Sequence, residues 1–214
     1  KAFQTFVSTM QNQIKFMSAS PEMAFYDKMV KVTSSNNPRI FLFPPTEQLE
    51  KLKVEDVYAV YEKAYKTANN YTFVMVGNFE IDKIAPLLET YLGGLPTSQE
   101  KRNFVDRKII FPAGITKEVV NKGKEQKSSV AMVFNGSWKL SDKNLVASRL
   151  LLHALKIKLR ESMREEQGGV YGVSANISLE ILPKTTYDIS VNWGCSPENV
   201  EKLINTVVEE MKKI

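Results

Sequence analysis

The sequence is poor in the residues that most often carry metal or hydrolytic chemistry. It contains one histidine, His153, and one cysteine, Cys195, among 214 residues. A lone cysteine excludes an internal disulfide, so both a reducing and a periplasmic compartment stay open. Zinc sites and Ser-His-Asp sites of the common kinds need several histidines, or one histidine with close partners. A complete site of either kind is therefore not expected within this chain.

Long apolar runs are also missing. The longest, FVMV at 73–76 and LVASRLLLHAL at 145–155, fall far short of the roughly 20 apolar residues that a membrane span needs. No membrane span is therefore expected. The composition, 43% hydrophobic and 25% charged, is that of a globular chain and excludes disorder, a collagen-like repeat and a disulfide scaffold.

The charge balance is basic, with a formal net charge of +5 and a pI near 9.1. Basic residues alternate with acids, however, as in KVEDVYAVYEKAYK at 53–66 and KIKLRESMREEQ at 156–167. This mixture is typical of solvated helix faces rather than of a basic stripe. Nucleic-acid binding is therefore not expected.

Hydrophobic periodicity predicts an α+β chain. Steps of three and four residues predict helices over 2–18, from Pro21, from about Thr46, over 78–94, over 141–167 and after Ser196. Short apolar or alternating runs predict strands at 71–77, 117–123, 127–136, 170–182 and 185–194. The chain opens on Lys1 and closes within a helical pattern, so we expect a piece excised from a longer protein.

The predicted elements fall into two parts. Residues 98–113 are charged and lack clear periodicity, which predicts a linker between a part at 1–97 and a part at 114–214. The segments VMVGNFEIDKIAPLLETYL (74–92) and SVNWGCSPENVEKLINTVV (190–208) echo each other as strand, glycine, acidic turn and amphipathic helix. The two parts are therefore candidates for copies of one α+β unit.

His153 is the obvious starting point for a metal site. On a helix it shares a face with three cations, Arg149, Lys156 and Arg160, which oppose a divalent ion. One helical turn on stand Lys156 and Ile157, so neither H-E-x-x-H nor H-x-x-E-H is formed. We interpret His153 as a surface residue and expect this chain alone to bind no metal.

The stretch MREEQGGVYGVSA at 163–175 is the most informative in the sequence. It places Arg164 in the last turn of a long helix and Tyr171 at the start of a strand, with a turn at Gly168 and Gly169 between them. A guanidinium offers fixed N–H donors to a carbonyl, and a phenol can donate to a developing oxyanion. Together the two residues resemble half of a site that cleaves peptide bonds.

A structural alternative stays open for both residues. An arginine is electrostatically favoured at any helix C-terminus. Tyr171 has the strand parity of Val173 and Ala175, which is the parity of a core-facing ring. The two glycines follow a helix rather than precede one, so we interpret them as a C-cap and turn, not as a phosphate cradle.

Two segments in this order resemble the insulinase/pitrilysin family of zinc metallopeptidases, and its long bacterial members in particular. They are YEKAYKTANNYTFVMVGNFEIDKIAPLLETYLGGLP at 61–96 and LRESMREEQGGVYGVSA at 159–175, and the similarity covers the chain from about residue 46 onward. It implies an α+β fold with an antiparallel sheet and helices packed on one face, in parts of two related metallopeptidase-like (processing-peptidase-like) units. In that family four such units form two halves around a peptide, so 1–97 would end the third unit and 114–214 would lie in the fourth.

The resemblance also implies roles and partners. Tyr171 would help to stabilise the tetrahedral intermediate, and Arg164 would hold the substrate backbone. The family's H-x-x-E-H motif is absent here, so zinc would be bound by residues outside this chain, and the chain alone is expected to be inactive. Its partners would be the N-terminal half of the same polypeptide or a paired subunit, together with a peptide substrate. The bacterial members imply a periplasmic or cell-envelope location.

Two other hypotheses remain beside this one. The chain could belong to a non-catalytic member of the same fold, which acts as a peptide-binding or assembly module. It could also be an unrelated α+β interaction domain in which Arg164 and Tyr171 are merely structural.

Overall fold

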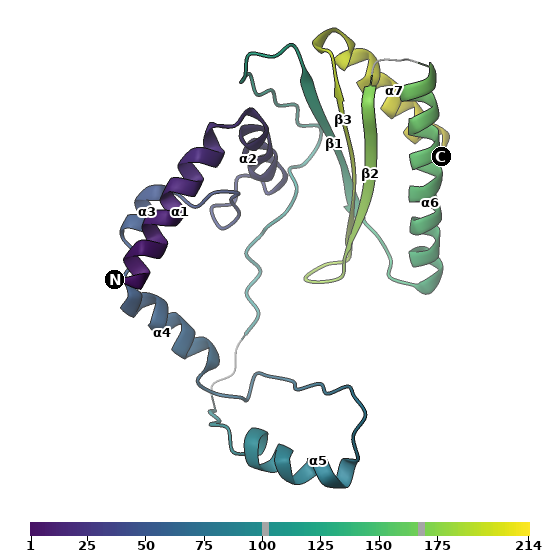
Figure 1. Cartoon of the computed structure of the whole chain (residues 1–214). Coiled ribbons are helices and arrows are strands. Elements are labelled where there is room, and N and C mark those ends of the chain that lie inside the picture. Colours follow the sequence, from purple (N-terminus) through teal and green to yellow (C-terminus); the bar gives the residue numbers. More distant parts are fainter. Residues whose placement is uncertain (100–102, 167–169) are drawn as a thin grey trace. The chain divides into compact units, whose positions relative to one another are not determined.

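The computed structural model describes residues 1–99, 103–166 and 170–214, and it describes their side chains except at 164–166 and 171. The chain forms two compact units, Lys1–Val120 and Asn121–Ile214. Each unit has its own set of secondary-structure elements (Figure 1).

The regular elements described in the first unit are all helices, and irregular segments connect them. Its elements are α1 (Ala2–Ala19), α2 (Pro21–Thr33), α3 (Thr46–Glu50), α4 (Val54–Tyr65) and α5 (Ile81–Leu88), the last extended by a π-helical turn, η1 (Glu89–Gly93). The predicted starts at Ala2 and Pro21 are confirmed, and the Ser20 hydroxyl accepts the Met23 amide at 3.3 Å as an N-cap. The single helix predicted from Thr46 is wrong, because the chain leaves the helix at 51–53: Leu49 is buried but Leu52 is exposed, and a new helix starts at Val54.

Two predicted strands do not form. Residues 71–77 and 117–123 belong to no strand, and Val74 and Val76 are 79% and 95% exposed. A strand needs a neighbour to take up its N–H and C=O groups, and the described residues of this unit contain none. The apolar run at 71–77 therefore stays an irregular, exposed segment here.

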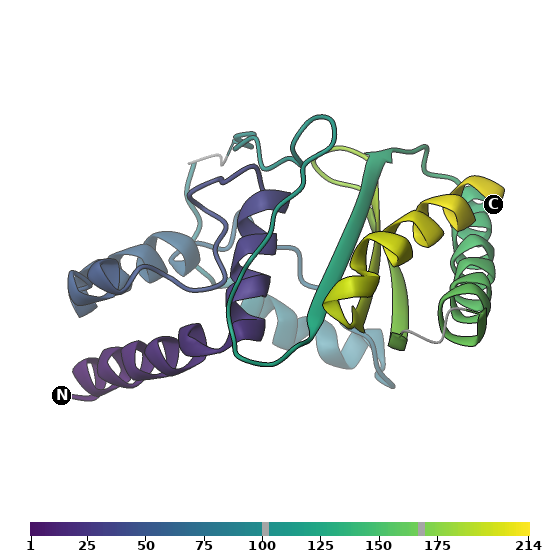
Figure 2. The ribbon, with the colours of Figure 1, turned by 90° about the horizontal axis from the view of Figure 1, so that it is seen from above.

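The second unit carries the sheet. Its elements are β1 (Ser128–Ser137), α6 (Asp142–Arg160) with a π-helical turn η2 (Glu161–Glu166), β2 (Val170–Glu180), β3 (Thr186–Cys195), a 3₁₀ turn η3 (Pro197–Asn199) and α7 (Val200–Lys213). All strand pairs are antiparallel in the order β1-β3-β2, and α6 and α7 lie on one face of the sheet (Figure 2). The predicted α+β fold is confirmed. Ser196 is the N-cap residue of the 3₁₀ turn, with Pro197 in its first turn, but the Ser196 side chain makes no capping hydrogen bond.

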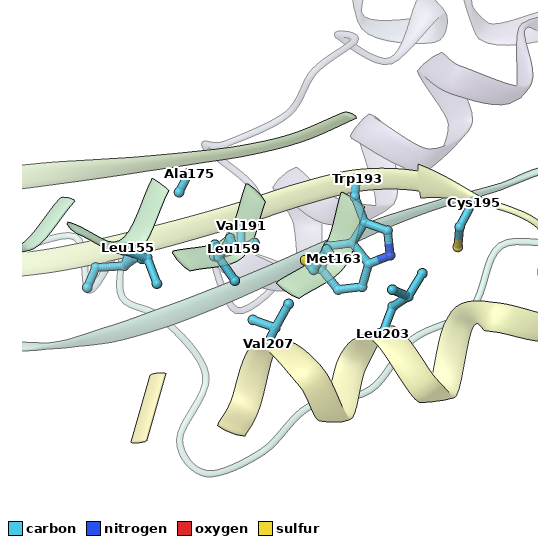
Figure 3. Packing of buried hydrophobic residues seen from close by; sticks show 10 residues of the cluster. Leu155, Leu159, Met163, Ala175, Val191, Trp193, Cys195, Leu203 and Val207 are labelled. Carbon is cyan, nitrogen blue, oxygen red and sulfur yellow. The ribbon is translucent and has the colours of Figure 1, made fainter. Parts of the chain in front are cut away.

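The core of the second unit lies between the sheet and its two helices. Alternate residues of β3 point into it, and Val191 is fully buried. The helices contribute one buried stripe each, as the periodicity of 141–167 predicts. The cluster is drawn in Figure 3 and consists of Leu155, Leu159, Met163, Ala175, Ile189, Val191, Trp193, Cys195, Leu203 and Val207.

Candidate functional site at the end of helix α6

Helix α6 is fixed at its start and along one face. The Ser141 hydroxyl accepts a hydrogen bond from the Asn144 amide at 3.2 Å and so caps the helix. Leu155 and Leu159 are buried against the sheet. These contacts fix the orientation of α6, and therefore the position of the chain at its C-terminal end, where the candidate site lies.

The π-helical turn that follows α6 is anchored by a buried residue and a buried carboxylate. Met163 is fully buried in the core, and Ser162 and Glu210 are almost so. Lys213 Nζ lies 2.7 Å from Glu210 Oε1, and this bond, with help from the Ser162 hydroxyl, holds the pKa of Glu210 below its ordinary value. An ionised Glu210 therefore ties the turn to α7, directly before Arg164.

Strand β2 contains a β-bulge at Tyr171, the second predicted site residue. Val170 pairs with Cys195 and Gly172 pairs with Gly194, so Tyr171 is an extra residue without a partner in β3. Val170 and Val173 both pack on the core although they are three residues apart. The sequence pattern predicts a core-facing Tyr171 because inward and outward residues alternate along a strand. This alternation holds only from Val173 onward, since the bulge interrupts it.

The backbone positions of Arg164 and Tyr171 lie in two elements that pack together. Arg164 is in η2 and Tyr171 is at the start of β2, and these elements are in contact. Their side chains are not among those described, so the convergence of guanidinium and phenol stays a prediction. Gly168 and Gly169, predicted to form the turn, lie outside the described residues.

The sheet face opposite the helices is polar, and none of its residues is among the predicted site residues. The Ser178 hydroxyl bonds to the Asp188 carboxylate, while burial raises the pKa of Asp188 above its ordinary value. The signal was the strict alternation of polar with apolar residues in both strands. The face carries Ser174, Asn176 and Ser178 on β2 and Asp188, Ser190 and Asn192 on β3.

His153 lies on the surface of the second unit, and Cys195 lies in its core. His153 is exposed on α6 beside the exposed Lys156 and Arg160, which confirms a surface histidine. Among the described residues no three His, Cys, Asp or Glu side chains gather as metal ligands, so these residues do not fit a zinc ion. Cys195 is fully buried, and burial raises the pKa of its thiol, which keeps it protonated.

None of the described helices is both long and apolar enough to cross a membrane.

Known proteins resemble this chain over nearly its whole length. It is 27% identical to a zinc protease PQQL-like of Arabidopsis thaliana, over 95% of this chain and 23% of that protein. It is also 27% identical to the probable zinc protease PqqL of Escherichia coli K12, over 93% of this chain and 20% of that protein. The chain thus spans about a fifth of the length of these relatives.

Solved structures share the fold. The periplasmic protease PqqL from Escherichia coli matches with a TM-score of 0.84 at 22% identity, over 99% of this chain and 23% of that one. The ferredoxin protease FusC matches with a TM-score of 0.80 at 15% identity, over the same shares. The model of the peptidase M16 inactive domain matches residues 51–214. The metallopeptidase resemblance is therefore confirmed, and the chain belongs to the peptidase M16 inactive-domain family.

Proposed function

We propose that this chain is the zinc-free part of a zinc metalloendopeptidase, and that it supplies peptide binding and transition-state stabilisation to a zinc site elsewhere in the parent protein. The observation that supports this most is the pair of backbone irregularities at the two predicted residues. Arg164 lies in a π-helical turn and Tyr171 on a β-bulge, and both kinds of irregularity recur at functional sites.

The chemistry assigned to the two residues needs no metal ligand from this chain. The Tyr171 phenol donates a hydrogen bond to the oxygen that becomes negative as the peptide carbonyl turns tetrahedral. The Arg164 guanidinium donates to carbonyl oxygens of the substrate backbone and so orients the scissile bond. The polar sheet face, with Ser174, Ser190 and Asn192, offers further donors and acceptors to an extended peptide.

The remaining parts of the site belong to polypeptide outside this chain. Because the described residues do not fit a zinc ion, we assign the metal, and the groups that activate water, to the N-terminal half of the parent or to a paired subunit. The relative PqqL of known structure is a periplasmic protease, which supports a periplasmic location for the parent as well. A chain of 214 residues without that half is expected to be inactive.

The proposal is tested by Tyr171→Phe in the full-length parent. Loss of one oxyanion donor lowers kcat by about 100- to 1000-fold, and the variant should fold like the wild type because only a hydroxyl is removed. Tyr187→Phe is the matched control, since Tyr187 pairs with Gly136 and Leu179 near the far end of the same sheet. Unchanged kcat in Tyr171→Phe, with the control also unchanged, would contradict the proposed role.

Arg164→Lys tests the second role separately. Lysine keeps the charge but loses the planar fork of N–H donors, so we expect KM for a peptide substrate to rise more than kcat falls. Steady-state kinetics on peptides of increasing length measures both constants. An equal loss in kcat at unchanged KM would instead place Arg164 at the reacting carbonyl.

A second candidate function is a non-catalytic peptide-binding or assembly module of the same fold. Membership of a family of inactive domains favours it. A purified parent with stoichiometric zinc and peptidase activity that a chelator abolishes would exclude it. The third hypothesis, an unrelated α+β interaction domain, is wrong because the chain belongs to the peptidase M16 inactive-domain family.

A further inference from the structure

Helix α6 carries a second row of apolar side chains, on the side that faces away from the sheet. Val146, Leu150 and Ile157 are 56%, 66% and 41% exposed. They follow each other at steps of four and seven residues, so they lie in one row along the helix. The buried Leu155 and Leu159 hold the opposite side of α6 in the core, so this outer row stays turned outward.

Lysine and arginine side chains flank this apolar row. From Lys143 to Arg160 the helix contains five lysines and arginines, all exposed, and no aspartate or glutamate. Arg149, Lys156 and Arg160 follow each other at steps of seven and four residues and form the neighbouring row on one side. Lys158 lies on the other side. The outer face of α6 therefore combines an apolar row with positive charge on both flanks.

Most of these charges have no acidic partner. Lys158 Nζ lies 3.0 Å from Glu161 Oε2, just beyond the end of the helix. The other four cations of α6 form no ion pair with any side chain that the structure describes. The glutamates that make the sequence of 156–167 look mixed all follow Arg160, the last residue of α6. The charge of this face therefore stays available to an anionic partner.

We propose that the outer face of α6 binds the surface of an anionic phospholipid bilayer. Val146, Leu150 and Ile157 enter the boundary between headgroups and acyl chains, and the flanking lysines and arginines reach the lipid phosphates through their long apolar stems. The 19 residues of α6 give a contact about 28 Å long in the plane of the surface. Such binding needs no membrane span, and it holds whether or not the parent is catalytically active.

Other anionic or apolar partners match this face less well. A nucleic acid supplies phosphates but leaves the apolar row in water. A second copy of the chain covers the apolar row but brings two sets of like charges together. An acidic protein has to present a matching apolar groove as well, whereas every patch of an anionic bilayer offers both phosphates and an apolar interior.

Co-sedimentation of the full-length parent with phospholipid vesicles tests the proposal. The protein should pellet with phosphatidylcholine vesicles that contain about one third phosphatidylglycerol, and not with pure phosphatidylcholine. Raising the salt from about 0.1 M to 1 M should release it, because the Debye length falls from about 10 to 3 Å. No binding to the anionic vesicles, or equal binding to both kinds, would overturn the proposal.

Two pairs of substitutions in the parent locate the charges. Arg149→Gln with Lys156→Gln should weaken vesicle binding roughly 25-fold, at about fivefold for each cation. Lys124→Gln with Lys184→Gln is the matched control, because it removes two exposed cations that lie outside α6. It should weaken binding by no more than about twofold, since screening limits the reach of charges that do not touch the bilayer. Equal losses in the two pairs would overturn the assignment to α6.

Leu150→Asp tests the apolar row. A carboxylate at this position removes an inserted side chain and repels lipid phosphates, so binding should fall at least about tenfold. Leu182→Asp, at a position 81% exposed in the turn between β2 and β3, is the control and should bind like the wild type. Both side chains are exposed, so both variants should keep the wild-type midpoint in urea.

Undiminished vesicle binding by Leu150→Asp would overturn the insertion of the apolar row. Immobilised polyglutamate distinguishes the alternative partner. Retention on polyglutamate that depends on Arg149 and Lys156, in a parent that binds no anionic vesicles, would overturn the proposal in favour of an acidic protein.

Discussion

Met163→Ala tests the idea that the π-helical turn before Arg164 is held by the core of the second unit. Met163 is fully buried, in one cluster with Leu159, Trp193 and Val207. Truncation of a buried methionine costs roughly 2–5 kcal/mol, and a flexible side chain at the end of a helix favours the lower half, about 3 kcal/mol. A unit of roughly 90 residues has about 5–14 kcal/mol of stability, so the variant should still fold.

Tryptophan fluorescence in urea measures this loss selectively. The chain contains two tryptophans, Trp138 and Trp193, and both lie in the second unit. With an m-value of about 1–3 kcal/mol/M, a loss of 3 kcal/mol moves the midpoint down by roughly 1–3 M. Trp138→Phe as background leaves the buried Trp193 as the single reporter of the core.

Leu150→Ala is the control, because Leu150 lies on the same helix but is 66% exposed. It should change stability by less than about 0.5 kcal/mol. If Met163→Ala costs no more than Leu150→Ala, the turn is not anchored by the core, and the support for a fixed Arg164 backbone is lost. A large cost in both variants would instead show that the loss is not specific to the buried side chain, since alanine is the better helix former at both positions.

The remaining predictions concern the two ends of the second unit's helices. Ser141→Ala removes the cap of α6 and should cost about 1 kcal/mol in the same urea titration, whereas a cost near zero would show that the Asn144 amide finds another acceptor. Glu210→Gln should destabilise at pH 7, because the lowered pKa of Glu210 means that its ionised form stabilises the fold. That contribution is present above the unfolded value near 4.5 and is lost as the pH falls through the folded value. The difference between variant and wild type should therefore shrink below about pH 4.5, and a difference independent of pH would contradict the ion pair as its source.

The elements that the sequence predicts well are those whose stability is local or whose neighbours lie in the same unit. The periodicity of α1, α2 and α6 requires only a helix with one apolar face. The alternation in β2 and β3 succeeds because each strand finds a partner within a few dozen residues. The run at 71–77 has an equally strong strand pattern but fails, because its hydrogen bonds need partners that the described first unit does not contain.

The candidate site is predicted in composition but not in geometry. The chemistry of Arg164 and Tyr171 follows from their side chains, yet strand parity alone turns Tyr171 toward the core. The bulge interrupts the alternation on which that prediction depends. A bulge depends on the register between two strands, so the sequence of one strand does not predict it. Gly172, a glycine inside a strand pattern, was the one available signal.

Both units contain a similar run of apolar residues, glycine and helix, but only the second unit contains strands that pair with it. In the second unit β3 lies between β1 and β2, the helix that follows it packs on one face of the sheet, and the residues of β3 that face the helices are buried. In the first unit a similar sequence remains exposed, and Leu49 is the one buried apolar residue among those described. Because a core forms only where several faces meet, stability measurements on the 214-residue chain report on the second unit.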